Sequence, residues 1–138
     1  MKIILANGTE LNPLMVTGGS RYVNGANRDC LNFVFDENAS MDELDGIFTE
    51  ANCESIKIYG KVAVGIDANG NTVYEDSVAT HNDYVIRAEL KQSFESVAKE
   101  NPDTQEQTVK RITVSMAQRS YMEKQMKLLE ARLAKLEA

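Results

Sequence analysis

The sequence contains one histidine, His81, and no tryptophan. A metal site built on two histidines is therefore excluded, and a Ser-His-Asp triad would depend on a single residue in a polar segment. The glycine-rich residues 18–25 lack the Gly-Lys-Ser/Thr ending of a phosphate-binding loop. Residues 67–71 resemble the start of an EF-hand calcium loop, but Thr72 and Val78 replace the glycine and the glutamate that this loop requires. We expect no enzyme, no cofactor and no metal site.

Cysteine and long apolar runs are also scarce. Cys30 and Cys53 lie outside any Cys-x-x-Cys spacing. They can form a disulfide, but we favour two buried free thiols in a reducing cytoplasm. The apolar run at residues 3–6 is shorter than the core of a signal peptide, which spans about 7–15 residues. No run approaches the roughly 20 residues that a membrane span needs, so we expect neither a secretion signal nor a membrane segment.

Charge is unevenly placed along the chain, whose formal net charge is −6. Residues 1–100 hold 16 acidic and 8 basic side chains, whereas residues 101–138 hold 5 acidic and 7 basic ones. An acidic body repels both the phosphate backbone of nucleic acid and the surface of anionic lipid. We therefore exclude nucleic acid and membranes as partners.

The dipeptide Asn-Gly occurs three times, at residues 7–8, 24–25 and 69–70. It favours tight turns with positive φ, and between apolar stretches it is a strong hairpin signal. Apolar and polar residues alternate over residues 84–91 and 109–116. This pattern is typical of strands with one solvent-exposed face, which usually pair antiparallel. We predict a small, mainly antiparallel β domain, a sandwich or a roll, over residues 1–116.

One short helix is expected to interrupt these strands near residues 41–49. Ser40 and Glu43 match a capping box, in which each side chain satisfies the exposed backbone N–H of the other. Apolar residues follow at helical spacing and would pack on the sheet. The polar residues 99–108 are interpreted as a long surface loop between the last two strands.

A second, amphipathic helix is predicted over residues 117–138, which makes the fold class α+β. Its strong helix formers carry apolar residues at coiled-coil spacing, with Arg119 at the first position of the seam. The charge of Arg119 can disfavour that first turn and move the start of the coil to Met122. In a parallel coil, Arg132 of one chain can meet Glu137 of the next. We predict that oligomerisation uses Met122, Met126, Leu129, Arg132, Leu133, Leu136 and Glu137.

Two arrangements of this helix remain open. It can fold back and lay its apolar stripe on its own sheet, as most amphipathic helices do. It can instead project and self-associate as a dimer or a trimer. Tyr121 and Leu128 widen the stripe beyond a strict seam, which suits a fold-back or a trimer. We favour self-association, because no Gly, Pro or Asn provides a hinge between Met116 and Gln118.

Four stretches that cover most of the chain carry a resemblance: "ILANGTELNPLMVTGGSRYVNGANRDCLNFVF", "SMDELDGIFTEANCESIKI", "YVIRAELK" and "VSMAQRSYMEKQ". In amino-acid sequence and in their order along the chain, they resemble a group of short uncharacterised proteins encoded in the tail-morphogenesis modules of phages and prophages of Gram-positive bacteria. The resemblance implies a structural component of the virion tail tip or baseplate, assembled in the cytoplasm of the bacterial host. It implies other tail or baseplate proteins as partners, and it carries over no functional residue.

The sequence thus favours a structural virion protein that docks on other tail proteins. Its C-terminal helix would join copies of the chain or anchor a fibre. The alternative is a module that binds a carbohydrate or protein receptor on the host surface. Such a module usually presents exposed aromatic side chains, and this sequence has few.

Overall fold

The computed structural model describes residues 1–97 and 107–137, and within these ranges it contains two antiparallel sheets and two helices. The first sheet has the strand order β2-β1-β5-β6 and consists of β1 (Lys2–Ile4), β2 (Glu10–Leu11), β5 (Ser55–Ile66) and β6 (Thr72–Asn82). The second has the order β3-β4-β8-β7 and consists of β3 (Met15–Val23), β4 (Ala26–Phe35), β7 (Ile86–Val97) and β8 (Gln107–Ala117). The helices are α1 (Met41–Ile47) and α2 (Tyr121–Glu137). The prediction of a mainly antiparallel α+β fold with a short helix and a C-terminal helix is confirmed.

The two sheets share one hydrophobic core. Ile3 and Ile56 of the first sheet belong to the same buried cluster as Phe33 and Val114 of the second. Of the residues predicted to share one face of β8, Ile112, Val114 and Met116 are fully buried, whereas Lys110 is half-buried. The strand lies between β4 and β7 in the second sheet. Apolar alternation therefore identified one buried face of this strand. It did not predict that Ser115, on the opposite face, is buried as well.

Two of the predicted hairpins show why Asn-Gly marks their turns. Asn24 and Gly25 have φ values of 48° and 82° and connect Val23 to Ala26, which pair across the strands. Both residues therefore take the left-handed conformation of a two-residue turn. In the third Asn-Gly turn, the Asp67 carboxylate accepts hydrogen bonds from backbone N–H groups two and four residues later. A turn thus accounts for the residues that resemble a calcium loop.

Helix α1 begins as predicted, because the Ser40 hydroxyl accepts a hydrogen bond from the Glu43 N–H at 3.5 Å. It ends at Ile47, two residues before the predicted end. Phe48 follows it with its side chain buried against the core. The guanidinium of Arg87 on β7 donates hydrogen bonds to the carbonyl oxygens of Asp45 and Phe48, which ties the helix to the second sheet.

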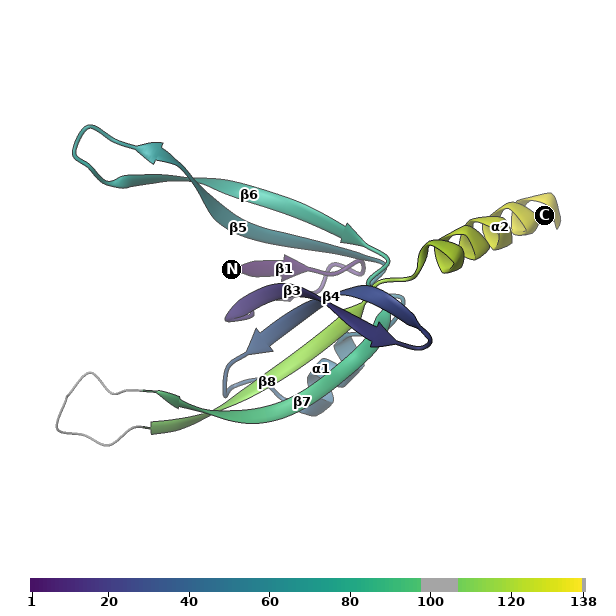
Figure 1. Ribbon diagram of the computed structural model, residues 1–138, viewed down its shortest axis with the longest axis horizontal. Coiled ribbons are helices and arrows are strands. Elements are labelled where there is room, and N and C mark those ends of the chain that lie inside the picture. The colour runs from purple at the N-terminus through teal and green to yellow at the C-terminus, as the bar shows by residue number, and fades with distance from the viewer. Residues whose placement is uncertain (98–106, 138) are drawn as a thin grey trace.

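Two long hairpins, β5–β6 and β7–β8, extend beyond the core on the side of the molecule opposite to α2 (Figure 1). The distal part of the β5–β6 hairpin, residues 61–76, is exposed on both faces, and we call it the ribbon. The predicted alternation of Val62, Val64 and Ile66 therefore marks a strand but not a buried face, since all three are exposed. A bulge between Ala63 and Gly65 also breaks their alternation.

The predicted surface loop at 99–108 falls mostly outside the described residues. Gln107 and Thr108, its last two residues, already belong to β8.

Candidate oligomerisation site

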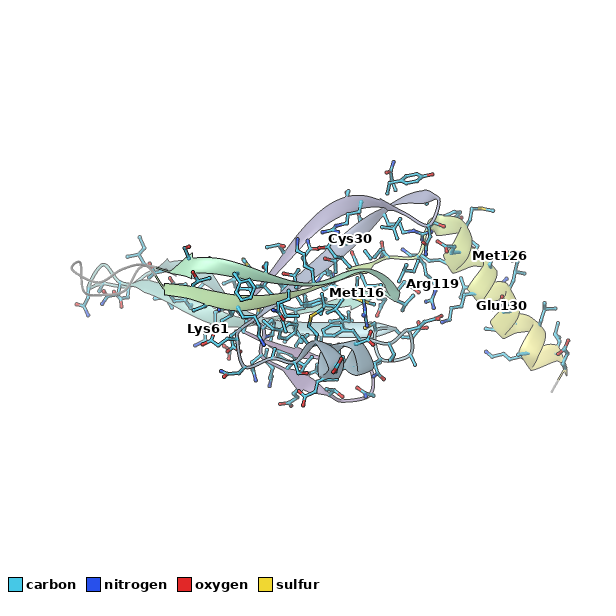
Figure 2. All side chains as sticks on the ribbon, turned by 90° about the horizontal axis from the view of Figure 1, so that it is seen from below. Cys30, Lys61, Met116, Arg119, Met126 and Glu130 are labelled. Carbon is cyan, nitrogen blue, oxygen red and sulfur yellow. The ribbon has the colours of Figure 1, made fainter. Side chains whose placement is uncertain are left out.

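The junction between β8 and α2 is held to the body by hydrogen bonds. The backbone N–H groups of Gln118 and Arg119 donate to the carbonyl oxygens of Asp29 and Asp83, each at 2.8 Å. The Arg119 side chain is 8% exposed and makes ion pairs with three carboxylates, at 3.0 Å to Glu50, 2.9 Å to Glu54 and 2.8 Å to Asp83. Figure 2 shows Arg119 at the base of the helix. Arg119 therefore lies before the helix and not in the seam, because its carboxylate partners hold it in the body. Of the two predicted starts of the stripe, Arg119 and Met122, only Met122 lies within α2.

Helix α2 begins at Tyr121, four residues later than predicted, because Ala117 still belongs to β8. Ser120 and Glu123 form a complete capping box. The Glu123 N–H donates to the Ser120 hydroxyl at 3.3 Å, and the Ser120 N–H donates to the Glu123 carboxylate at 2.8 Å. The sequence motif Ser-x-x-Glu at residues 120–123 is a signal that could have given this boundary.

Two ion pairs link the first turns of α2 to the body. Arg28, which is buried on β4, pairs with Glu123, and Glu54 pairs with Lys127. We call these two contacts the clamp. Arg28 also donates hydrogen bonds to the carbonyl oxygens of Val23 at 2.7 Å and Gln118 at 3.2 Å, so its position is fixed from several sides. Glu123 and Lys127, a favourable pair within an isolated helix, each pair with the body instead.

The apolar stripe of α2 consists of Met122, Met126, Leu129, Leu133 and Leu136. These side chains are 69%, 57%, 51%, 55% and 82% exposed, respectively, and none of the described residues of α2 is buried. The helix extends away from the body and does not fold back on either sheet (Figure 1). The fold-back is therefore not the arrangement seen, and self-association through the stripe stays a prediction.

The clamp sets which way the stripe faces. At about 100° per residue, the side chains of Glu123 and Lys127 lie roughly a third of a turn from the centre of the stripe. The stripe therefore faces sideways into solvent while the clamp side faces the body. The predicted site residues Arg132 and Glu137 lie on opposite flanks of the stripe by the same geometry. In Figure 2, Met126 and Glu130 lie on the helix beyond Arg119.

The carboxylates of the clamp are strongly acidic. Hydrogen bonding to Arg119, with a smaller contribution from Lys127, lowers the pKa of Glu54 from 4.5 to about 2. Hydrogen bonding to Arg28 and to the Ser120 backbone lowers the pKa of Glu123 from 4.5 to about 2. Both groups are therefore charged in the folded protein down to a pH well below their ordinary range.

These shifts predict a pH dependence of stability. Because the folded-state pKa values are lowered, the stabilisation is present above pH 4.5 and is lost as the pH falls towards 2. We expect the free energy of unfolding, measured with urea, to fall across this window. The variant Glu54→Gln should show a shallower fall, since one of the two carboxylates is gone. An unchanged slope would contradict a role for Glu54 in acid sensitivity.

The two cysteines are free and buried. Burial raises the pKa of Cys53 to about 12 and also raises the pKa of Cys30. Both therefore remain protonated thiols at neutral pH, which are poor nucleophiles. Of the two interpretations of the cysteines, the structure agrees with the free thiols.

A groove of about 700 Å³ lies where the ribbon meets the body. It is lined by Tyr59, Gly60 and Val78 among others. The ammonium of Lys2 lies 4.8 Å from the centroid of the Tyr59 ring and covers one of its faces.

The comparisons with known proteins returned no relative. No family model, curated protein or solved structure matches the chain. Among residues 1–97 and 107–137, no helix is both long and apolar enough for a membrane crossing. The same residues contain no group of three or more His, Cys, Asp or Glu side chains placed to hold a metal ion. The fold and the exposed stripe define the chain as an antiparallel β body with a projecting amphipathic helix.

Proposed function

We propose that the chain is a structural protein of a phage virion, at the tail tip or baseplate. Its two sheets form a β-sandwich body that docks on other tail proteins, and α2 joins copies of the chain as a coiled coil or anchors a fibre. The observation that carries the proposal is the solvent-exposed apolar stripe on a helix whose base is tied to the body by ion pairs. The virion context comes from the resemblance to proteins of tail-morphogenesis modules.

The energetics of the stripe favour association. A large apolar side chain contributes about 1.5–3 kcal/mol when it is fully buried. The five residues of the stripe are all more than half exposed, so much of this contribution is available only on contact with another molecule. None of these side chains is β-branched, and such residues are compatible with either a dimer or a trimer.

Substitution of two seam residues tests the self-association. The full chain should sediment as an oligomer, and Leu129→Asp with Leu133→Asp should give a folded monomer because a charged seam cannot be buried without a partner. The matched control is Ala131→Asp with Ala134→Asp, which adds the same charge on the far side of α2 and should leave the oligomer intact. A wild-type chain that remains monomeric at high concentration would contradict the proposed self-association.

The virion role has a separate test. An antibody against the chain should label the tail tip or baseplate of particles from a host that carries the gene. Particles without the protein would contradict the proposal.

The second candidate function is binding to a receptor on the host surface. The exposed aromatic side chains Tyr22, Tyr74, Phe94 and Tyr121 are spread over four different elements. This distribution favours the structural role. Specific labelling of host cells by the purified protein would reverse this order.

A further inference from the structure

The two flanks of the apolar stripe carry different charges. Glu123, Glu130 and Glu137 recur every seven residues along one flank, and Gln125 and Arg132 lie along the other. All five belong to the described part of α2, which spans 17 residues. The stripe is therefore bordered by a continuous acidic side and by a neutral-to-basic side.

This asymmetry distinguishes the two ways in which a second helix can lie on the stripe. In an antiparallel pair like flanks meet, so that Glu130 would face Glu130 of the second copy and Glu123 would face Glu137 of the second copy. Rows of carboxylates at such positions repel each other and disfavour the pairing. In a parallel pair, Arg132 meets Glu137 of the second copy and Gln125 meets Glu130 of the second copy. The charges of α2 therefore fit a second copy of the same helix in parallel orientation.

The two ion pairs of the clamp fix the direction in which the stripe faces before a second copy binds. The stripe begins at Met122, two residues after the capping residue Ser120 and next to Glu123, which pairs with the buried Arg28. The Lys127 pair with Glu54 lies one turn further along. With both pairs formed, the helix can neither rotate freely about its axis nor swing freely from the body. Less freedom is then lost when a second copy binds.

From these observations we infer that the stripe is occupied by α2 of a second copy in parallel, and that the clamp acts as a positioning device for this contact. The inference rests on the self-association proposed above and adds its orientation and the role of Arg28 and Glu54. Parallel helices place the bodies of the copies together at one end. The β5–β6 and β7–β8 hairpins then point away from the helices at the other end, as the single chain already shows (Figure 1).

Cysteine cross-linking tests the orientation in the full chain. Leu136→Cys protein should form a disulfide-linked pair under mild oxidation, since equivalent seam positions meet in a parallel coil. The wild type should not cross-link, because Cys30 and Cys53 are buried. A mixture of Met122→Cys and Leu136→Cys copies should give no mixed link, because the two sites lie about 21 Å apart along the axis of a parallel pair.

Each other outcome overturns a defined part of the inference. A predominantly mixed link would show an antiparallel pair, and an oligomer without a Leu136→Cys self-link would also contradict the parallel seam. Both results would leave self-association itself standing. A wild-type chain of monomeric mass would overturn the self-association as well.

A charge reversal tests the clamp. Lys127 lies outside the seam and both of its flanks, so Lys127→Glu changes no residue at the contact but places two carboxylates together at Glu54. We expect the dissociation constant of the oligomer, measured by sedimentation equilibrium, to rise about tenfold through lost pre-organisation. The matched control Lys135→Glu makes the same charge change at an exposed site on the same helix and should stay within about twofold of the wild type. Equal effects of the two variants would overturn the positioning role.

Discussion

Arg119→Ala is expected to lower the free energy of unfolding by about 3 kcal/mol, the lower end of what breaking a buried ion pair costs. The substitution leaves Glu50, Glu54 and Asp83 together without their common cation. The cost is at the lower end because Glu50 is 71% exposed and stays hydrated. Urea denaturation monitored by circular dichroism measures the change.

A second arginine supplies the matched control. Arg111 also contacts two carboxylates, Glu37 at 3.1 Å and Glu95 at 3.2 Å, but these partners are 55% and 63% exposed. Arg111→Ala should therefore cost less than about 1 kcal/mol. If both variants lose the same stability, Arg119 is an ordinary surface cation and not the centre of the junction. Arg119→Lys should fall between them, because an ammonium cannot reach the carboxylates in the forked geometry of a guanidinium.

Phe48→Ala is expected to cost about 3–5 kcal/mol, since it leaves a cavity in the core. The Phe48 ring is 2% exposed, and its centroid lies 5.3 Å from that of Phe33 and 6.0 Å from that of Phe35. This loss is a large fraction of the stability of a typical domain, which is about 5–15 kcal/mol. A shift of the urea midpoint with an unchanged slope would identify the effect as lost stability rather than altered compactness.

Phe94→Ala is the control for Phe48→Ala. Phe94 is 67% exposed on β7, and its loss should change stability by less than about 0.5 kcal/mol. Equal effects of the two variants would contradict the burial of Phe48 between α1 and the second sheet.

The elements that the sequence predicted correctly are those with local causes. Asn24-Gly25 requires positive φ at two adjacent residues, and Ser40 caps the helix that follows it, so each feature depends on residues close in the chain. The alternation around Val114 likewise depends on one strand. The pairing of β4 with β8 and of β1 with β5 joins distant segments, and no local pattern predicts it.

The site was predicted only in part for the same reason. The apolar stripe follows from helical spacing alone, so its five residues could be named from the sequence. Arg28 and Glu123 are separated by 95 residues, and neither has a local feature that identifies the other. Arg119 falls at a seam position by seven-residue spacing, which contains no information about tertiary contacts. In the structure, ion pairs with three carboxylates hold its side chain against the body instead. The Ser-x-x-Glu motif at residues 120–123 shows that one boundary could have been corrected from sequence.

The ribbon at residues 61–76 has a consequence for how the molecule opens. Its amide groups have strand partners within the hairpin but no core beneath them, whereas Ile112, Val114 and Met116 on β8 are fully buried. Opening free energies in a protein range from near zero up to that of global unfolding, in cooperative units that follow burial. The ribbon amides should therefore exchange their hydrogens through local separation of two strands, long before those of β8. A molecule that binds the ribbon could order it or change its conformation without unfolding the body. Such binding would slow amide hydrogen exchange in the ribbon and not in β8.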